Sequence, residues 1–216
     1  MKKKFLAGLT VGLMMFGVVE LAEAAIYDPT ADFSITNGNP NGVWSYGWMP
    51  TDFSTFHLYQ TADSYWNNWS TDELGVYHLP GIWRSSTPQP VVPDVIALHP
   101  GPQGQASVLR WTTPIAGEYQ ISGQFFSGDL ATPIVGIREN NAWLWQATDA
   151  GTFALTRTVT ANETVDFVVY NDFYYGSTPL DLKITSVPEP STIFLFSVGI
   201  VGLAGNRLKK KRGKAQ

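Results

Sequence analysis

Apolar and polar residues alternate with a period of two along the second half of the chain. The segments SVLRW, GEYQISGQFF, TFALTRTVT, TVDFVVY and PLDLKIT show this alternation. Because successive side chains of a strand point to opposite faces, the pattern predicts β-strands with one buried face. The residues expected to face inward are Leu109, Trp111, Tyr119, Ile121, Phe125, Phe153, Leu155, Val159, Val165, Phe167, Val169, Leu180, Leu182 and Ile184. Arg157 interrupts one apolar face, which predicts a position near a sheet edge or a strand end.

Turn-forming residues such as Ser127-Gly128-Asp129 and Ala161-Asn162-Glu163 separate these segments, and no sustained helical period occurs between them. The first half is less regular. There, residues 32–37 predict an opening strand, residues 94–99 predict a short strand, and long loops rich in Gly, Pro and Asn connect them. Many short strands at this spacing predict an all-β fold: one antiparallel β-sandwich of the jelly-roll kind.

The first 24 residues have the order of a secretory signal peptide. Lys2–Lys4 precede 15 uncharged residues, and Ala22-Glu23-Ala24 then offers a cleavage site before Ala25. A membrane anchor is the alternative, but the apolar run is shorter than the roughly 20 residues that span a bilayer. The pattern favours cleavage and export.

Charge is segregated along the chain. The whole sequence has a net charge of −4, whereas residues 25–186 contain 15 Asp and Glu against five Lys and Arg, a net charge of −10. Nucleic acids and anionic membranes need clustered cations, so this part of the chain is a poor partner for either. The composition suits neutral glycans, cations, or simply a solvated surface. The sequence has no cysteine, so its fold rests on the core and not on disulfides.

Sequence signatures of catalysis are absent. The chain has no G-x-S-x-G, no S-x-x-K and no thiol, and the spacing of His57, His78 and His99 matches no metal motif. A glycosidase needs two carboxylates about 5 to 10 Å apart, and the adjacent pair Asp72 and Glu73 is weak evidence for one. We therefore predict a non-enzymatic protein, with a small glycan-active hydrolase as an alternative.

Acidic loops can hold a structural Ca²⁺ ion, because this cation takes oxygen ligands from side chains and backbone. The segment NDFYYGSTPLD places Asn171, Asp172 and Asp181 around a turn, and Asp28 or Asp32 can join them from the first strand. No calcium-binding loop motif occurs, so the donor types alone support this site.

Aromatic residues are the most informative feature of the first half, because six of the eight tryptophans lie before residue 112. The i, i+2 spacing in VWSYGWMP and NAWLWQ predicts rings on one face of a strand. In SYWNNWS, aromatic rings stand beside amides, a mixture that suits a sugar, whose C–H face packs on a ring while its hydroxyls bond to polar groups. Core packing is the alternative, favoured for Trp44, Trp111 and Trp143. The candidate glycan-binding residues are Tyr65, Trp66, Asn67, Asn68, Trp69 and Trp83.

The C-terminal segment has three parts. VPEPST at residues 187–192 fixes an extended backbone through two prolines, and a 13-residue apolar run follows at residues 193–205. As a helix this run is about 20 Å long, a brief transmembrane segment if flanking residues snorkel. The basic residues expected to stop transfer are Arg207, Lys209, Lys210, Lys211 and Arg212.

Motif, apolar run and basic cluster together resemble the PEP-CTERM sorting signal of Gram-negative bacteria. The resemblance implies that Pro188, Glu189 and Pro190 are recognised by a membrane-embedded exosortase, which processes the protein and makes its residence in the inner membrane transient. Such proteins often occur in bacteria that make exopolysaccharide. The remainder is similar, more diffusely, to β-sandwich ectodomains, some of them jelly rolls related to carbohydrate-binding modules.

These observations predict three parts: a signal peptide at residues 1–24, a β-sandwich at 25–186 and a sorting signal at 187–212. The expected function is that of an exported cell-surface or extracellular-matrix protein whose sandwich binds glycan. A purely structural envelope protein without a ligand is the second alternative.

Overall fold

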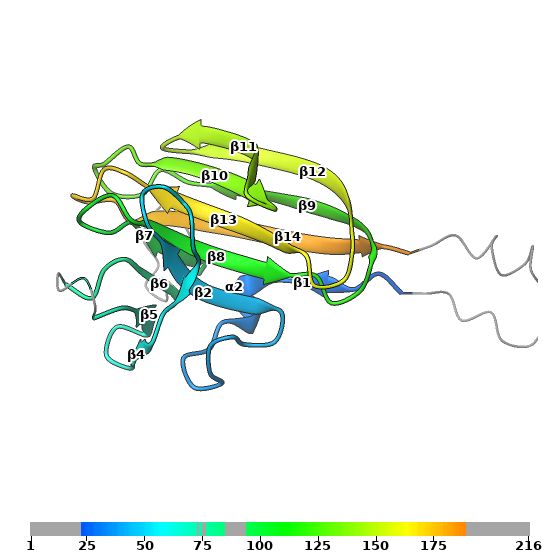
Figure 1. Cartoon of the computed structure of the whole chain (residues 1–216), viewed down its shortest axis with the longest axis horizontal. Coiled ribbons are helices and arrows are strands. Elements are labelled where there is room, and N and C mark those ends of the chain that lie inside the picture. The colour runs from blue at the N-terminus through cyan, green and yellow to red at the C-terminus, as the bar shows by residue number, and fades with distance from the viewer. Residues whose placement is uncertain (1–22, 73, 75–76, 85–93, 189–216) are drawn as a thin grey trace, which may run out of the picture. The chain divides into compact units, whose positions relative to one another are not determined.

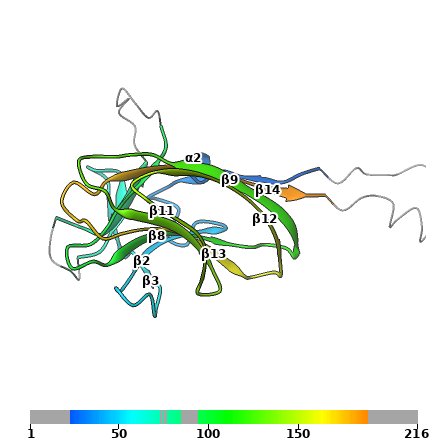
Figure 2. The same cartoon turned by 90° about the horizontal axis from the view of Figure 1, so that it is seen from above.

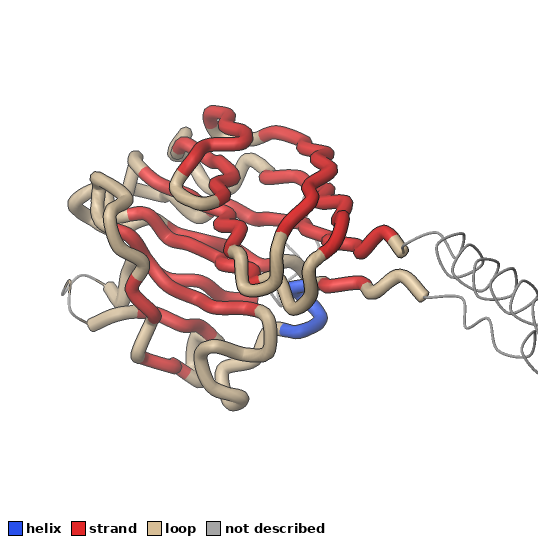
Figure 3. Tube along the Cα trace, turned by 45° about the vertical axis from the view of Figure 1, so that its right-hand side comes forward, coloured by secondary structure: helices blue, strands red, loops and turns tan. Residues whose placement is uncertain are grey.

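The computed structural model describes residues 23–72, 74, 77–84 and 94–188. Residues 25–187 form one compact unit. Nearly all of its regular structure is β-strand, with one short helical turn (Figure 3). The strands form two antiparallel sheets that stack face to face (Figures 1 and 2). The predicted antiparallel β-sandwich is confirmed.

The larger sheet has the strand order β12-β9-β14-β7-β6-β5-β4, and β1 pairs with the far end of β14. Its strands are β1 (Ile26–Tyr27), β4 (Thr61–Asp63), β5 (Asn68–Ser70), β6 (Gly81–Arg84), β7 (Ile96–His99), β9 (Gly117–Phe125), β12 (Gly151–Val159) and β14 (Thr178–Val187). Arg157 lies on β12, the edge strand, as the sequence predicts.

The smaller sheet has the order β11-β10-β13-β8-β2-β3. Its strands are β2 (Trp44–Met49), β3 (His57–Leu58), β8 (Ala106–Thr112), β10 (Ile134–Glu139), β11 (Ala142–Thr148) and β13 (Thr164–Tyr170). From β7 to β10 and again from β11 to β14 the chain changes sheet at every connection, as in a jelly roll. The short strand predicted within residues 94–99 is β7.

The core lies between the two sheets and is rich in aromatic rings. Every residue that the period-two pattern places inward is buried, except Leu155, which is half-buried. Phe125 illustrates the packing: its ring is fully buried, parallel to Trp145 at a centroid distance of 6.0 Å and 5.8 Å from Phe153. The alternation of the sequence is thus the alternation of core and surface.

Residues 32–37 do not form the predicted opening strand. Asp28 caps a short helix, α2 (Pro29–Asp32), by accepting hydrogen bonds from two backbone N–H groups, and Pro29 suits the first helical position. Directly after it, the Ser34 hydroxyl accepts from the backbone N–H groups of Thr36 and Asn37 and bends the chain. Local side-chain hydrogen bonds thus replace the ladder that a strand would need.

Trp143 and Trp145 do not share a face, contrary to the prediction from their spacing. The pairing of β10 with β11 shifts register: Ile137 lies opposite Trp145, and the next residue, Arg138, lies opposite Trp143. Leu144 is the extra residue of a β-bulge. A bulge advances a strand by one residue and so reverses which face each later side chain occupies.

The bulge divides the two rings between the core and the outer face of the smaller sheet. Trp145 packs against the central cluster, whereas Trp143 lies with Phe53 and Tyr170 in a second cluster. There the Arg138 guanidinium lies over the rings of Phe53 and Trp143, at 4.9 Å and 5.1 Å. Aromatic rings and the Arg138 side chain therefore cover part of the outer face of this sheet.

The two described ends of the sandwich are held side by side (Figure 1). The backbone N–H of Ala25, the predicted start of the mature chain, donates to the Ser186 hydroxyl at 2.7 Å, and Ser186 N–H donates to the Ala25 carbonyl. The predicted signal helix and apolar C-terminal helix lie outside the described residues. Among the residues that are described, none belongs to a helix long and apolar enough to cross a membrane.

Candidate functional site

A tight hairpin between β4 and β5 carries part of the predicted glycan site. Asp63 pairs with Asn68 across the hairpin, and the Asp63 carboxylate accepts from the backbone N–H groups of Tyr65 and Trp66. Asn67 takes a left-handed backbone conformation with φ 51°, which asparagine tolerates better than most residues. This turn presents the rings of Tyr65 and Trp66, which are 83% and 65% exposed.

The neighbouring strands continue the site on the outer face of the larger sheet. Asn68 on β5 lies directly opposite Trp83 on β6, so their side chains point the same way. His99 on β7 lies on this face as well, and its ring centroid is 6.4 Å from that of Trp83. Trp69, one residue further along β5, points to the other face.

Trp69 belongs to the core. It is 6% exposed, its indole N–H donates to the Ser34 carbonyl at 2.8 Å, and its ring is stacked with that of Tyr46. Of the two tryptophans in SYWNNWS, the structure therefore leaves only Trp66 accessible to a ligand, because the strand alternation begins between them.

A pocket of about 300 Å³ lies at this surface, and it gathers three of the predicted residues with others that are distant in sequence. Its described lining consists of Trp66, Asn68, Tyr77, His78, Leu79, Trp83, His99, Asp129 and Ser177. Asp129 and Ser177 come from two loops that meet through a hydrogen bond from Asp129 N–H to the Ser177 carbonyl. A Cβ on Gly128 would lie 1.5 Å from that carbonyl oxygen, so the approach requires glycine.

The polar groups of this pocket are incompletely paired. Asn68 is 6% exposed, and its Oδ1 makes no hydrogen bond within the described part of the chain. His99 is also buried, and its Nδ1 donates to the Pro100 carbonyl at 2.8 Å. In the neutral ring this leaves Nε2 as an acceptor. The pocket thus combines aromatic rings with the polar side chains of Asn68 and His99.

His78 and Asp72 form a hydrogen-bonded pair beside the pocket. The imidazole Nδ1 lies 2.8 Å from Asp72 Oδ1, and the Thr61 hydroxyl donates to the other carboxylate oxygen. These two partners hold the pKa of Asp72 below its ordinary value. The carboxylate pair suggested for Asp72 and Glu73 includes a residue, Glu73, that lies outside the described residues.

His99 should make the stability of the sandwich pH-dependent. Burial lowers the pKa of His99 below its ordinary value of 6.5, outweighing the bond to Pro100. Below pH 6.5, His99 therefore binds more protons in the unfolded chain than in the folded one. Its contribution to the free energy of unfolding falls as the pH falls. We expect urea midpoints at about pH 8 and about pH 5.5 to differ less in His99→Phe than in the wild type. Equal pH dependence in both proteins would contradict this assignment.

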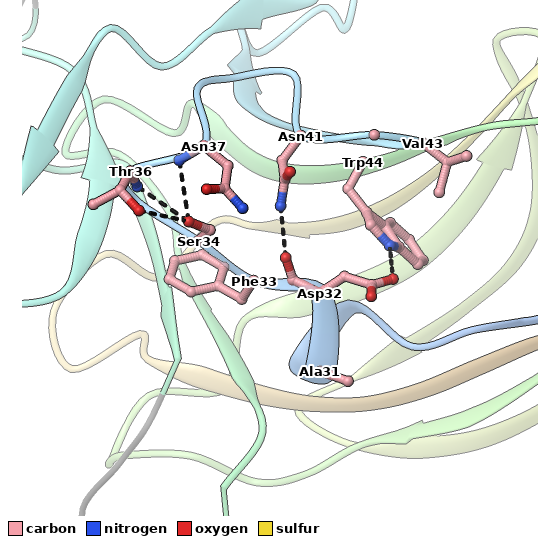
Figure 4. A pocket seen from close by; sticks show the side chains of 10 residues that line it. Ala31, Asp32, Phe33, Ser34, Thr36, Asn37, Asn41, Val43 and Trp44 are labelled. Carbon is pink, nitrogen blue, oxygen red and sulfur yellow. Dashed lines mark hydrogen bonds between the residues drawn. The ribbon is translucent and has the colours of Figure 1, made fainter.

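A second, larger pocket of about 660 Å³ lies beside α2 (Figure 4). Its polar groups bond mainly to one another: the Trp44 indole N–H donates to the Asp32 carboxylate, and the Asn41 amide donates to the Asp32 carbonyl. The Ser34 hydroxyl, as described above, accepts from the backbone of its own turn. These contacts stabilise the loop itself, so the pocket near Asn68 is the better candidate for a ligand.

The predicted metal ligands do not converge in the described part of the structure. His57 lies on β3 of the smaller sheet and stacks on Trp48, whereas His99 lies on β7 of the larger sheet and lines the pocket with His78. Asp172 accepts from Thr132 N–H, and the other acidic candidates cap α2, bond to Trp44 or lie exposed on β14. Within residues 23–188, as far as they are described, no group of three or more His, Asp or Glu side chains could hold a metal ion. A structural Ca²⁺ ion stays a prediction.

The sorting residues lie almost entirely beyond the described structure. Pro188 is exposed and directly follows β14, whereas Glu189, Pro190 and the basic cluster are outside the described residues. At the other end, Ala24 and Ala25 are described and Ala22 is not.

Comparison with solved structures finds distant likenesses. A family 36 carbohydrate-binding module in complex with calcium and xylotriose is 15% identical over 49% of this chain and 87% of its own, with a TM-score of 0.34. The corresponding module of a multidomain xylanase from the hindgut metagenome of Trinervitermes trinervoides is 12% identical over 50% and 87%, with a TM-score of 0.36. Bushbaby GITRL is 14% identical over 67% and 94%, with a TM-score of 0.28.

Comparison with curated protein sequences finds no match. A family model does match the C-terminal segment, over residues 186–210, and it describes the PEP-CTERM protein-sorting motif. The matched residues include the Pro-Glu-Pro element, the apolar run and the first basic residues, in the order that the sequence analysis identified. This chain therefore carries a PEP-CTERM protein-sorting motif behind a β-sandwich domain.

Proposed function

We propose that this is an exported cell-surface or extracellular-matrix protein whose β-sandwich binds glycan without cleaving it. The single observation that carries the binding proposal is the pocket of about 300 Å³ in which the exposed rings of Trp66 and Tyr77 lie with the polar residues Asn68, His99 and Asp129. Aromatic rings with a few polar groups are the lining that small polar ligands require.

Sugars match the remainder of the pocket. Their hydroxyl groups donate to an acceptor such as His99 Nε2, and their C–H faces pack on exposed aromatic rings. Trp66 and Tyr77 supply such rings at 65% and 85% exposure. A volume of about 300 Å³ is at the lower end of small-molecule sites, so the pocket suits one or two sugar units of a longer chain.

The sorting motif supplies the cellular context of the proposal. It supports export through the inner membrane and processing by an exosortase, with the protein reaching the envelope, the surface or the matrix. The pocket lies near Ser177, at the start of β14, whereas the motif follows Val187 at its end. Ten strand residues span about 30 Å, so the pocket is well separated from the end of β14 that the motif follows.

Binding is favoured over hydrolysis by the charges in the pocket. Among its described lining residues only Asp129 has a carboxylate, whereas glycoside hydrolysis needs two.

A glycan array with the full chain, purified in mild detergent, tests the proposal. We expect binding to one class of polysaccharide fragment and a loss of about tenfold or more in Trp66→Ala, because aromatic anchors dominate such contacts. Ile115→Ala is the control: its side chain is similarly exposed, at 67%, but precedes β9 at the end of the sandwich near Val187. Absence of binding by the wild type, or equal binding by both variants, would refute a glycan site at this pocket.

A further inference from the structure

The pocket near Asn68 offers acceptors and no described cation. Asn68 Oδ1 is unpaired, His99 donates its Nδ1 proton to Pro100 and so presents Nε2, and Asp129 contributes a carboxylate. Within the described residues that carboxylate makes no hydrogen bond or ion pair of its own. His78, which also lines the pocket, is paired with Asp72. Because Asp129 supplies a carboxylate and no lysine or arginine belongs to the described lining, a positive charge on the ligand would be favoured.

The charges of the whole domain also favour a positively charged ligand. Residues 25–186 have a net charge of −10, and their positive charges are few. Three arginines are in ion pairs, Arg84 with Asp94, Arg110 with Asp166 and Arg157 with Glu139, and Arg138 lies over aromatic rings on the outer face of the smaller sheet. The described surface thus has no basic cluster for an acidic polysaccharide.

We infer that the sugar unit bound at this pocket is an amino sugar with a free ammonium group, as in a partly deacetylated hexosamine polysaccharide. This inference rests on the proposed glycan binding and makes its ligand specific. An ammonium group has three donors and a positive charge, which match the Asp129 carboxylate. Its hydrogen bond to Asp129 is charge-assisted and therefore stronger than one between neutral groups.

Other sugars use the pocket less well. A neutral sugar can pack on Trp66, but it leaves the Asp129 carboxylate to water. A uronate brings a second negative charge next to Asp129, and two like charges side by side repel each other. The expected order of affinity is glucosamine oligomers first, N-acetylglucosamine oligomers second, and galacturonate oligomers last.

Calorimetric titration of the full chain in mild detergent with these three tetrasaccharides tests the order. We expect the glucosamine tetramer to bind about tenfold more tightly than its N-acetylated counterpart, the gain of one charge-assisted hydrogen bond. Asp129→Asn should remove this preference and leave the affinity for the N-acetylated tetramer within about twofold. Asp181→Asn is the matched control, because it removes the same charge from an exposed position on β14 outside the pocket.

Each outcome has one reading. If Asp129→Asn abolishes the preference and Asp181→Asn retains it, the inference is supported. If both variants reduce it equally, the attraction comes from the net charge of the domain, and the inference about this pocket is wrong. It is equally wrong if the two tetramers bind alike in the wild type, although glycan binding then still stands. If no oligosaccharide of any class binds, the proposed function itself fails.

Discussion

Replacement of Phe125 by alanine is expected to lower the free energy of unfolding of the Ala25–Val187 unit by about 4 kcal/mol. The Phe125 ring is fully buried on β9, parallel to Trp145 and close to Phe153, at the centre of the layer between the two sheets. Truncation removes the transfer free energy of the ring and leaves a cavity, because rigid aromatic neighbours on two other strands cannot collapse into it.

The adjacent residue is the control for this first prediction. Phe126 follows the last residue of β9 and is only half-buried, so Phe126→Ala should cost about 1 kcal/mol. Urea unfolding followed by tryptophan fluorescence measures both, with the m-value confirming that each variant unfolds in one step. Similar losses for the two variants would mean that the period-two pattern does not define the core at this strand.

Asn in place of Asp166 is expected to destabilise the same unit by about 3 kcal/mol. Asp166 on β13 lies directly between Arg110 on β8 and Arg138 on β10, on the outer face of the smaller sheet. Its carboxylate accepts two hydrogen bonds from Arg110, at 2.6 and 2.9 Å, and it is 6% exposed. Neutralising it leaves two neighbouring guanidinium groups that repel each other in a partly buried environment.

The surroundings of this pair increase the cost. The Phe56 ring lies 3.9 Å from the Arg110 guanidinium and limits its access to water. Desolvation already lowers the pKa of Arg138. Asp181→Asn, an exposed carboxylate on β14, should change the free energy of unfolding by less than about 0.5 kcal/mol. A loss below about 1 kcal/mol in Asp166→Asn would show that the carboxylate is not the counter-charge of both arginines.

The candidate pocket could be predicted from the sequence only in part. The mixture of rings and amides in SYWNNWS indicated the hairpin between β4 and β5, and Trp66, Asn68 and Trp83 do line one pocket. Nothing in the sequence indicated that Asp129 and Ser177 would join them, because these residues come from separate loops of a different part of the chain. Their approach depends on one glycine and a backbone hydrogen bond.

Some properties of this protein follow from the sequence by itself. The sorting motif is a local sequence pattern, matched at residues 186–210, so its residues identify it without any fold. The strands of the second half also follow from local sequence. In a regular strand, alternation with a period of two determines which side chains point to the core and which point away from it. Both conclusions depend on neighbours along the chain.

Only the tertiary structure decided the rest, because it depends on partners that are remote in sequence. The bulge at Leu144 separates Trp143 from Trp145, and it is set by the register against β10. Trp69 is buried and Trp66 exposed because the hairpin ends and β5 begins between them. Among the described residues, no donor from another strand or loop reaches the buried carbonyl of Asn68. The sequence determines which chemical groups each residue has, whereas packing determines which of those groups are paired, buried or exposed.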